Sequence, residues 1–219
     1  MNAICPVWKP VDVVSNDIVR IAKKNPHMSN KVGHAGTLDP FAEGILVLCF
    51  GEDTKKVSDI MAMKKEYFGK IKLGVETDTL DKTGEVYKTS QIPSLNDDTI
   101  QIVFDKFNGK INQNPPAYSA LKLNGKRLYE YARSGIRIIK KAREITIDSL
   151  ELIDYNGGDL ISFKTVCSSG TYIRSLASDL AKELGTHGYL EELQRSKIGD
   201  YTRENCLSME ELVNGNIER

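Results

Sequence analysis

Residues 33–50 read GHAGTLDPFAEGILVLCF and join a glycine-rich loop to an apolar run. Glycines and Pro40 keep residues 33–44 from forming a regular element, and Pro40 also moves Asp39 away from helical dihedral angles. Residues 45–50 are all apolar and lie between Gly44 and Gly51, a pattern typical of a strand buried on both faces. The stretch therefore places Asp39 on a loop anchored to the core and nominates its carboxylate as a catalytic group. Because aspartate before proline is also an ordinary turn initiator, spacing alone leaves a purely structural role open.

The rest of the chain alternates between strand and helix patterns. Strand patterns occur at 67–73, near 86–87, and at 144–153 and 160–167, where the Gly157-Gly158 turn predicts an antiparallel hairpin. Helical spacing occurs at 52–63, from about 96 to 107 and at 171–184, and Ser15-Asn16-Asp17 predicts a capped helix over about 16–24. This mixture predicts an α+β fold.

Composition excludes several classes of protein. A chain of 219 residues with 40% hydrophobic and 27% charged residues is an ordinary globular protein. It shows no secretory start and no apolar run of about 18 residues, so we expect a soluble, cytoplasmic, monomeric protein without a membrane partner. The four cysteines are far apart and only three histidines are present, which predicts reduced core cysteines and neither a metal nor a cofactor.

The net charge of zero hides a basic segment. Residues 122–143 carry eight Lys or Arg and one acid, Glu130, so this window has a charge of +7 and the remaining chain −7. Leucine and tyrosine side chains alternate with these cations and could add stacking to charge attraction. A solvated charged surface is the alternative, but the pattern favours contact with RNA.

The motif around Asp39 resembles GHxGxLDPxAxG, which is typical of TruB-type pseudouridine synthases. In that family the aspartate is the catalytic nucleophile, which here implies Asp39. Residues 168–176, SSGTYIRSL, resemble the family's SxGTYIRxL motif, in which the arginine pairs with the nucleophile and the tyrosine lies against the substrate. The implied residues are Arg174 and Tyr172. Lys64-Lys65-Glu66-Tyr67 resembles a K-x-Y segment whose tyrosine stacks on the target base and removes its C5 proton, so Tyr67 is the implied base.

Further blocks carry the same resemblance. His34 is implied to contact the RNA loop, Leu193 to line an apolar pocket in an L-x-x-L-x-R segment, and Lys9 to belong to a substrate-binding block with Pro10. Residues 115–143 resemble a thumb-like insertion that closes over an RNA stem-loop. Its implied RNA-contacting cations are Lys122, Lys126, Arg127, Arg133, Lys140 and Lys141.

The resemblance implies a single catalytic domain over residues 1–219 with a mixed, mostly antiparallel central sheet flanked by helices. Two differences from the family pattern stand out: Gln194 replaces an arginine, and Val13-Val14 replaces smaller residues or methionine. A third is expected, because residues 1–219 hold no segment for the C-terminal PUA-type domain that is usual in the family.

The implied activity is that of a tRNA pseudouridine synthase, an isomerase that converts a uridine in the T-loop of tRNA, position 55, into pseudouridine after base flipping. A non-catalytic tRNA-binding or tRNA-folding protein of the same fold is the alternative. A hydrolase using His34 and Asp39 would need a water-activating partner or a metal, and the sequence offers no candidate for either.

Overall fold

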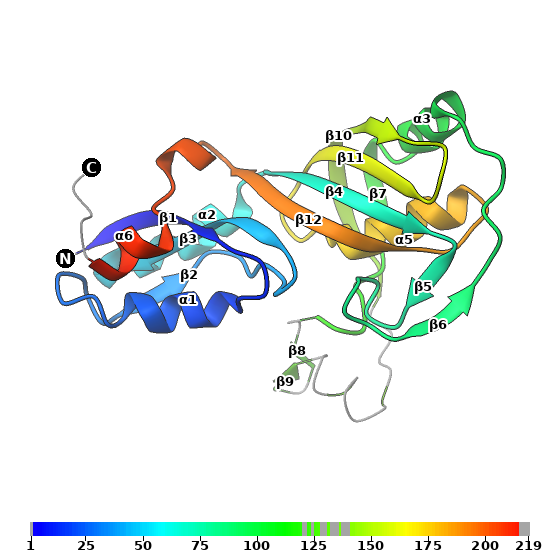
Figure 1. Ribbon diagram of the computed structural model, residues 1–219. Helices are drawn as coiled ribbons and strands as arrows, with labels where there is room; N and C mark the ends of the chain where they lie inside the picture. The colour runs from blue at the N-terminus through cyan, green and yellow to red at the C-terminus, as the bar shows by residue number, and fades with distance from the viewer. Residues whose placement is uncertain are drawn as a thin grey trace. The chain divides into compact units, whose positions relative to one another are not determined.

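The computed structural model describes residues 2–119, 122, 123, 125–127, 131, 136 and 141–214. The chain forms two compact units, Met1–Phe68 with Leu193–Arg219, and Gly69–Glu192, and each is described by itself. Two strands, β4 (Lys65–Leu73) and β12 (Gly188–Ile198), contribute residues to both units (Figure 1). The prediction of a single catalytic domain stays a prediction.

The first unit is built around strand β3 (Glu43–Phe50), which is buried along almost its whole length. β1 (Ala3–Lys9) and β2 (Val32–His34) pair antiparallel with β3, and the end of β12 pairs with it in parallel through Gln194 and Arg195. The helices of this unit are α1 (Ser15–Ala22), the 3₁₀ turn Gly51–Lys56, α2 (Val57–Ala62), the 3₁₀ turn Arg203–Asn205 and α6 (Met209–Asn214).

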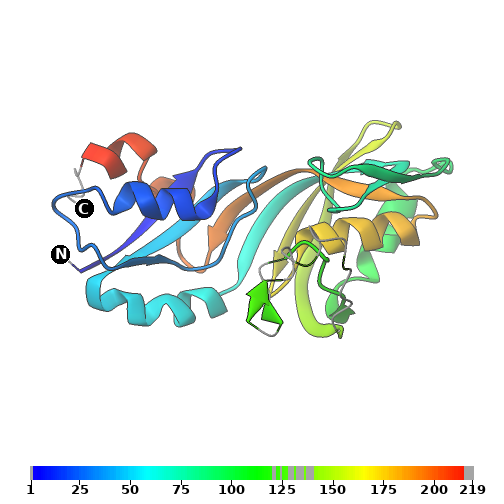
Figure 2. The same ribbon diagram turned by 90° about the horizontal axis from the view of Figure 1, so that it is seen from below.

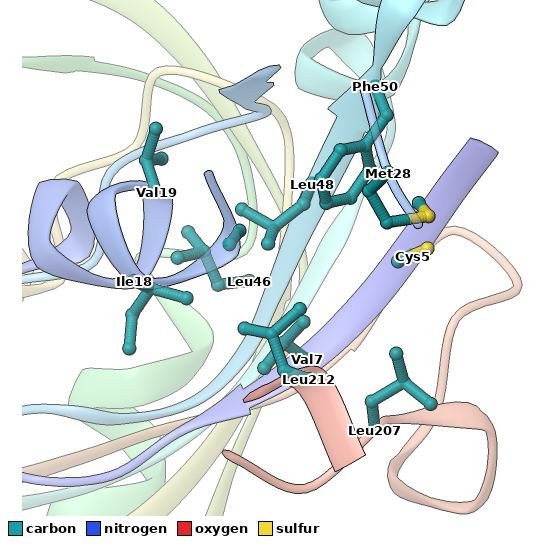
Figure 3. Packing of buried hydrophobic residues seen from close by; sticks show 11 residues of the cluster. Cys5, Val7, Ile18, Val19, Met28, Leu46, Leu48, Phe50, Leu207 and Leu212 are labelled. Atoms are coloured by element: carbon teal, nitrogen blue, oxygen red, sulfur yellow. The ribbon is translucent and has the colours of Figure 1, made fainter. Parts of the chain in front are cut away.

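Helices cover both faces of β3. Because successive side chains of a strand point to opposite faces, Leu46, Leu48 and Phe50 pack with residues of β1, α1 and α6, as Figure 3 shows. Ile45, Val47 and Cys49 pack on the other face with Ile60 of α2 and with Ile198. A strand fixed on both faces is a rigid support for the loop that precedes it, residues 35–42.

The second unit combines a sheet with two longer helices. β10 (Arg143–Tyr155) pairs antiparallel with β11 (Leu160–Cys167) and with β7 (Gly109–Gln113), and β4 lies beside β11. A separate hairpin consists of β5 (Val75–Thr77) and β6 (Val86–Thr89). α3 (Asp97–Asp105) contacts β10 and α5 (Ile173–Glu183), and the two helices are visible beside the sheet in Figure 2.

Most sequence predictions for the elements are confirmed. The α+β fold with its mixed, mostly antiparallel sheet, the buried strand at 45–50, the hairpin of β10 and β11, and the helices near 97–105 and 173–183 are all present. The predicted cap of the first helix is wrong. The helix begins at Ser15 itself and has no side-chain cap hydrogen bond. The Ser15 hydroxyl instead reaches Leu38, in the loop beside Asp39.

Several strands were missed: the short β2, β5, β7, β8 and β9, and the longer β1 and β12. The two longer ones were missed for physical reasons. β1 contains Pro6, which normally argues against a strand, but β1 is an edge strand and therefore tolerates a residue without a backbone N–H. β12 carries Leu190 and Leu193 three positions apart, a spacing also found in helices.

The basic segment is described only in part. Its described portion contains a short hairpin of β8 (Lys122–Leu123) and β9 (Lys126–Arg127). In the parts of the chain that the structure describes, no helix is long and apolar enough to cross a membrane.

Candidate active site

Asp39 lies on an irregular loop between β2 and β3, in the first unit. The loop residues 35–42 form no helix or strand, and Asp39 itself is half-buried while its neighbour Leu38 is fully packed in the core. Gly44, the second residue of β3, has φ of +123°, and a Cβ there would lie 2.3 Å from the carbonyl oxygen of Arg195. Only glycine therefore allows β12 to approach the end of this loop so closely.

Two buried side chains hold the backbone on either side of Asp39. The Ser15 hydroxyl accepts a hydrogen bond from the Leu38 N–H at 3.0 Å and donates one to the Leu38 carbonyl at 2.8 Å. The Lys9 ammonium donates to the carbonyls of Pro10, Val13 and Pro40 at 2.7–3.2 Å. The carbonyls of the residues directly before and after Asp39, Leu38 and Pro40, are thus bonded to side chains of the core.

Lys9 is also an electrostatic partner of Asp39. The Lys9 side chain is fully buried, and this burial lowers the pKa of its ammonium from the ordinary 10.5 to about 8. The nearby carboxylate of Asp39 acts in the opposite direction and raises that pKa, as Asp12 and Glu43 also do, while Arg195 lowers it. At neutral pH Lys9 is therefore still a cation beside the candidate nucleophile. Its predicted contact with RNA stays a prediction, and the contacts observed are with backbone carbonyls.

Arg195 holds the same loop from β12. Its guanidinium is buried and donates to the carbonyls of Gly36 at 3.0 Å and Thr37 at 3.4 Å, before Asp39, and through Nε to Ile45 at 2.8 Å, after it. Its neighbour Gln194 donates to the Glu43 carboxylate at 2.6 Å. The sequence motif pointed to Leu193 in this segment and gave no role to Arg195.

The other predicted site residues of the first unit lie on strands. Tyr67 is buried on β4, and Leu193 is buried on β12, the neighbouring strand. These two strands are joined where the Ser196 hydroxyl donates to the backbone carbonyl and the carboxylate of Glu66. His34 ends β2, where it is paired with Leu48 of β3. The structure thus gathers Asp39, Lys9, His34, Tyr67 and Leu193 in one unit.

Arg174 lies in the second unit, buried in the first turn of α5. Its guanidinium forms an ion pair with the Asp81 carboxylate at 3.3 Å and donates to the carbonyls of Thr79 and Tyr118, both at 2.8 Å. Asp81 is equally buried and also accepts hydrogen bonds from Thr83 and from the Thr79 hydroxyl. The guanidinium is therefore held in one orientation, whereas its predicted pairing with Asp39 stays a prediction.

The turn that carries Asp81 is itself anchored to α5. The hairpin of β5 and β6 places Glu76 in the interior, where its carboxylate accepts hydrogen bonds from Ser178 and Tyr87 and pairs with Lys182. These partners lower the pKa of the Glu76 carboxyl against the raising effect of its burial. Asp81 thus belongs to a turn that is fixed on the same helix as Arg174.

Tyr172 immediately precedes α5 and is held by an amide. The buried Gln113 side chain accepts from the Tyr172 N–H at 2.8 Å and donates to the Tyr172 carbonyl at 3.0 Å. One residue further on, the Asn114 carbonyl accepts from the Ser175 hydroxyl at 2.9 Å. Gln113 and Asn114 directly precede the predicted thumb-like insertion, so the chain that leads into it is fixed to the start of α5.

The RNA-contacting cations fall on the part of the chain described least. Lys122, Lys126 and Arg127 lie on the β8–β9 hairpin, Lys141 is exposed, and Arg133 and Lys140 lie outside the described residues. Within the described ranges, no group of three His, Cys, Asp or Glu residues is placed to hold a metal ion.

Comparison with known proteins identifies the family of the chain. Residues 23–173 match the model of the TruB family pseudouridylate synthase N-terminal domain, which covers more than half of the chain. The chain belongs to the TruB family of pseudouridylate synthases. The tRNA pseudouridine synthase B of Clostridium tetani is 42% identical over all of this chain and 75% of its own length, and that of Hydrogenovibrio crunogenus is 43% identical over 97% and 69%.

The TruB fold is also found among solved structures. A chain in the crystal structure of a Cbf5–Nop10–Gar1 complex superposes with a TM-score of 0.73 at 26% identity, over 96% of this TruB-family chain and 53% of that chain. The chain thus spans about half the length of that structural relative. The predicted family and its isomerase class are confirmed by the family match and the relatives' names.

Four residues that hold a predicted site residue or its loop within the same unit were missed by sequence reasoning: Ser15 and Arg195 in the first unit, and Asp81 and Gln113 in the second. The sequence predicts Ser15 as part of a helix cap and assigns no role to Asp81, because each finds its partner far away in the sequence. In the sequence, Arg195 is only the final residue of the L-x-x-L-x-R segment, and no local pattern indicates a role for Gln113.

Proposed function

We propose that this chain isomerises a uridine in the T-loop of tRNA, at position 55, to pseudouridine, with Asp39 as the nucleophile. The observation that carries the proposal is the family-specific loop whose peptide groups on both sides of Asp39 are bonded to buried side chains. A nucleophile held in this way has little freedom to leave its reactive position. The names of the relatives support tRNA as the substrate.

In the proposed reaction the Asp39 carboxylate attacks either C1′ of the ribose or C6 of the base. The bond between N1 and C1′ breaks, the uracil rotates, and C5 bonds to C1′. The bond that Asp39 formed also breaks, which returns the free carboxylate. The proton at C5 is lost and N1 gains one, so the product is an isomer of the substrate and no oxidant or reductant is needed. Tyr67 is the proposed group that removes the C5 proton.

The target uridine has to leave its stack to reach Asp39, which costs a few kcal/mol. Stacking on Tyr67 would return about 1–3 kcal/mol, and cations of residues 115–143 would add contacts with phosphates. Tyr67 is buried on a strand, and a ring that is packed before substrate arrives loses little conformational entropy on stacking. We propose that the protein acts inside the cell, where its tRNA substrate is found.

Release of tritium from tRNA labelled at uridine C5 tests the proposal. The wild-type protein should release tritium, and Asp39→Asn should release none while still binding tRNA in a filter assay. Asp98→Asn is the matched control, because Asp98 is exposed on α3 and the same charge is removed. An active Asp39→Asn variant would refute the nucleophile, and a wild-type protein that binds tRNA without releasing tritium would favour the non-catalytic alternative.

A further inference from the structure

One buried cation of the first unit has no part in the proposed chemistry and yet contacts the loop that carries it. Arg195 is 2% exposed, and its three hydrogen bonds go to the backbone carbonyls of Gly36, Thr37 and Ile45. These carbonyls lie on both sides of Asp39 along the chain. A single planar group therefore joins the start of the loop to the strand that follows it.

The backbone of Arg195 is fixed as firmly as its side chain. Arg195 pairs with Gly44 in the parallel contact of β12 with β3, and the approach is so close that a Cβ on Gly44 would lie within 2.3–2.9 Å of the Arg195 backbone. β3 is buried on both faces, so this anchor belongs to the most rigid part of the unit. Because the backbone of Arg195 is fixed, the loop carbonyls that its guanidinium binds are held in fixed positions as well.

The geometry requires an arginine and not only a positive charge. The guanidinium presents several N–H donors in a planar fork, so it can reach carbonyls on two separate segments at once, whereas a lysine ammonium is a point charge on a flexible stem. The neighbouring Lys9 and Ser15 bind the carbonyls of Pro40 and Leu38, next to Asp39, but neither reaches Gly36 or Ile45 through the hydrogen bonds that the structure shows for them. Lys9, Ser15 and Arg195 thus bind different backbone carbonyls of the loop and its flanks.

We infer that Arg195 is a positioning residue, which holds the Asp39 loop in its reactive conformation through these three carbonyls. The inference rests on the proposed function, because it assigns Arg195 an effect on the step in which Asp39 reacts. The inference predicts that the rate of that step depends on the planar N–H donors of the guanidinium and not on its positive charge alone. A displacement of about 1 Å at a reacting group lowers a rate by about 10²-fold.

The test compares Arg195→Lys and Arg195→Ala with wild type in single-turnover tritium release, tRNA binding by filter assay and thermal unfolding. Arg195→Lys should lower the single-turnover rate by about 10²-fold, while its Kd for tRNA stays within about twofold. Added guanidinium, kept far below denaturing concentration, should restore part of the rate of Arg195→Ala, and ammonium at the same concentration should not.

Asn25→Ala is the matched control for lost stability. Asn25 is 2% exposed in the same unit and donates to the Leu212 carbonyl, away from the loop of Asp39. It should lower the melting temperature but leave the single-turnover rate unchanged.

A folded Arg195→Lys variant with the wild-type rate would overturn the inference. An Arg195→Lys variant that cannot fold would also overturn it, because Arg195 would then be purely structural, and so would an equal loss of rate in Asn25→Ala. If wild type itself releases no tritium, the proposed function fails, which is a separate result.

Discussion

The buried Lys9 ammonium should make the stability of the protein depend on pH between about 8 and 10.5. Burial lowers the pKa of Lys9 from 10.5 to about 8. Below pH 8 the ammonium is charged in both the folded and the unfolded state. The folded state is then destabilised by the full cost of burying this charge. The difference between the two pKa values corresponds to about 3 kcal/mol.

The sign of the effect follows from proton binding. Between pH 8 and 10.5 the unfolded state holds the Lys9 proton more strongly than the folded state, so the free energy of unfolding rises with pH. From pH 7.5 to 9 the linkage relation gives a gain of about 1 kcal/mol from this single group. The gain is complete only above the unfolded-state pKa, and it is lost as the pH falls through 8.

Urea unfolding of wild type and Lys9→Met at pH 7.5 and pH 9 measures this gain. The difference in unfolding free energy between the two proteins should shift by about 1 kcal/mol in favour of wild type at pH 9. Burial raises the pKa of Cys5 to about 11 and that of Tyr189 to about 12, but both groups are present in both proteins and cancel in the difference. A difference that is the same at both pH values would refute the reasoning.

Two further predictions concern the second unit and the basic segment. Asp81→Asn should lower the free energy of unfolding by about 3 kcal/mol and slow tritium release, because it leaves the buried Arg174 cation without its carboxylate. The control Asp105→Asn changes an exposed residue and should alter neither quantity. An Asp81→Asn variant as stable as wild type would contradict the ion pair. Neutralising Lys126, Arg127, Lys140 and Lys141 should weaken tRNA binding and reduce the slope of log Kd against log salt by about 3, and an unchanged slope would mean that this segment is only solvated.

The local parts of the fold could be predicted from the sequence. Glycines, Pro40 and the apolar run at 45–50 determine the loop of Asp39 and strand β3 by their own backbone preferences. The apolar stripe of α5 and the glycine turn between β10 and β11 are equally local signals.

Tertiary partners decide the rest, and sequence reasoning could not supply them. Ser15 sits at the start of a helix, where a capping role is the usual expectation, yet its hydroxyl bonds to Leu38 across the unit. Asp81 looks like a turn residue until α5 brings Arg174 beside it. Arg195 becomes informative only when β12 lies parallel to β3, which no local pattern predicts.

The most direct test of the central claim is a map, at single-nucleotide resolution, of pseudouridine in unmodified tRNA treated with the purified protein. Wild type should introduce pseudouridine at position 55 of the T-loop, and Asp39→Asn should introduce none. Pseudouridine formed by Asp39→Asn, or a T-loop left unmodified by wild type, would contradict the account.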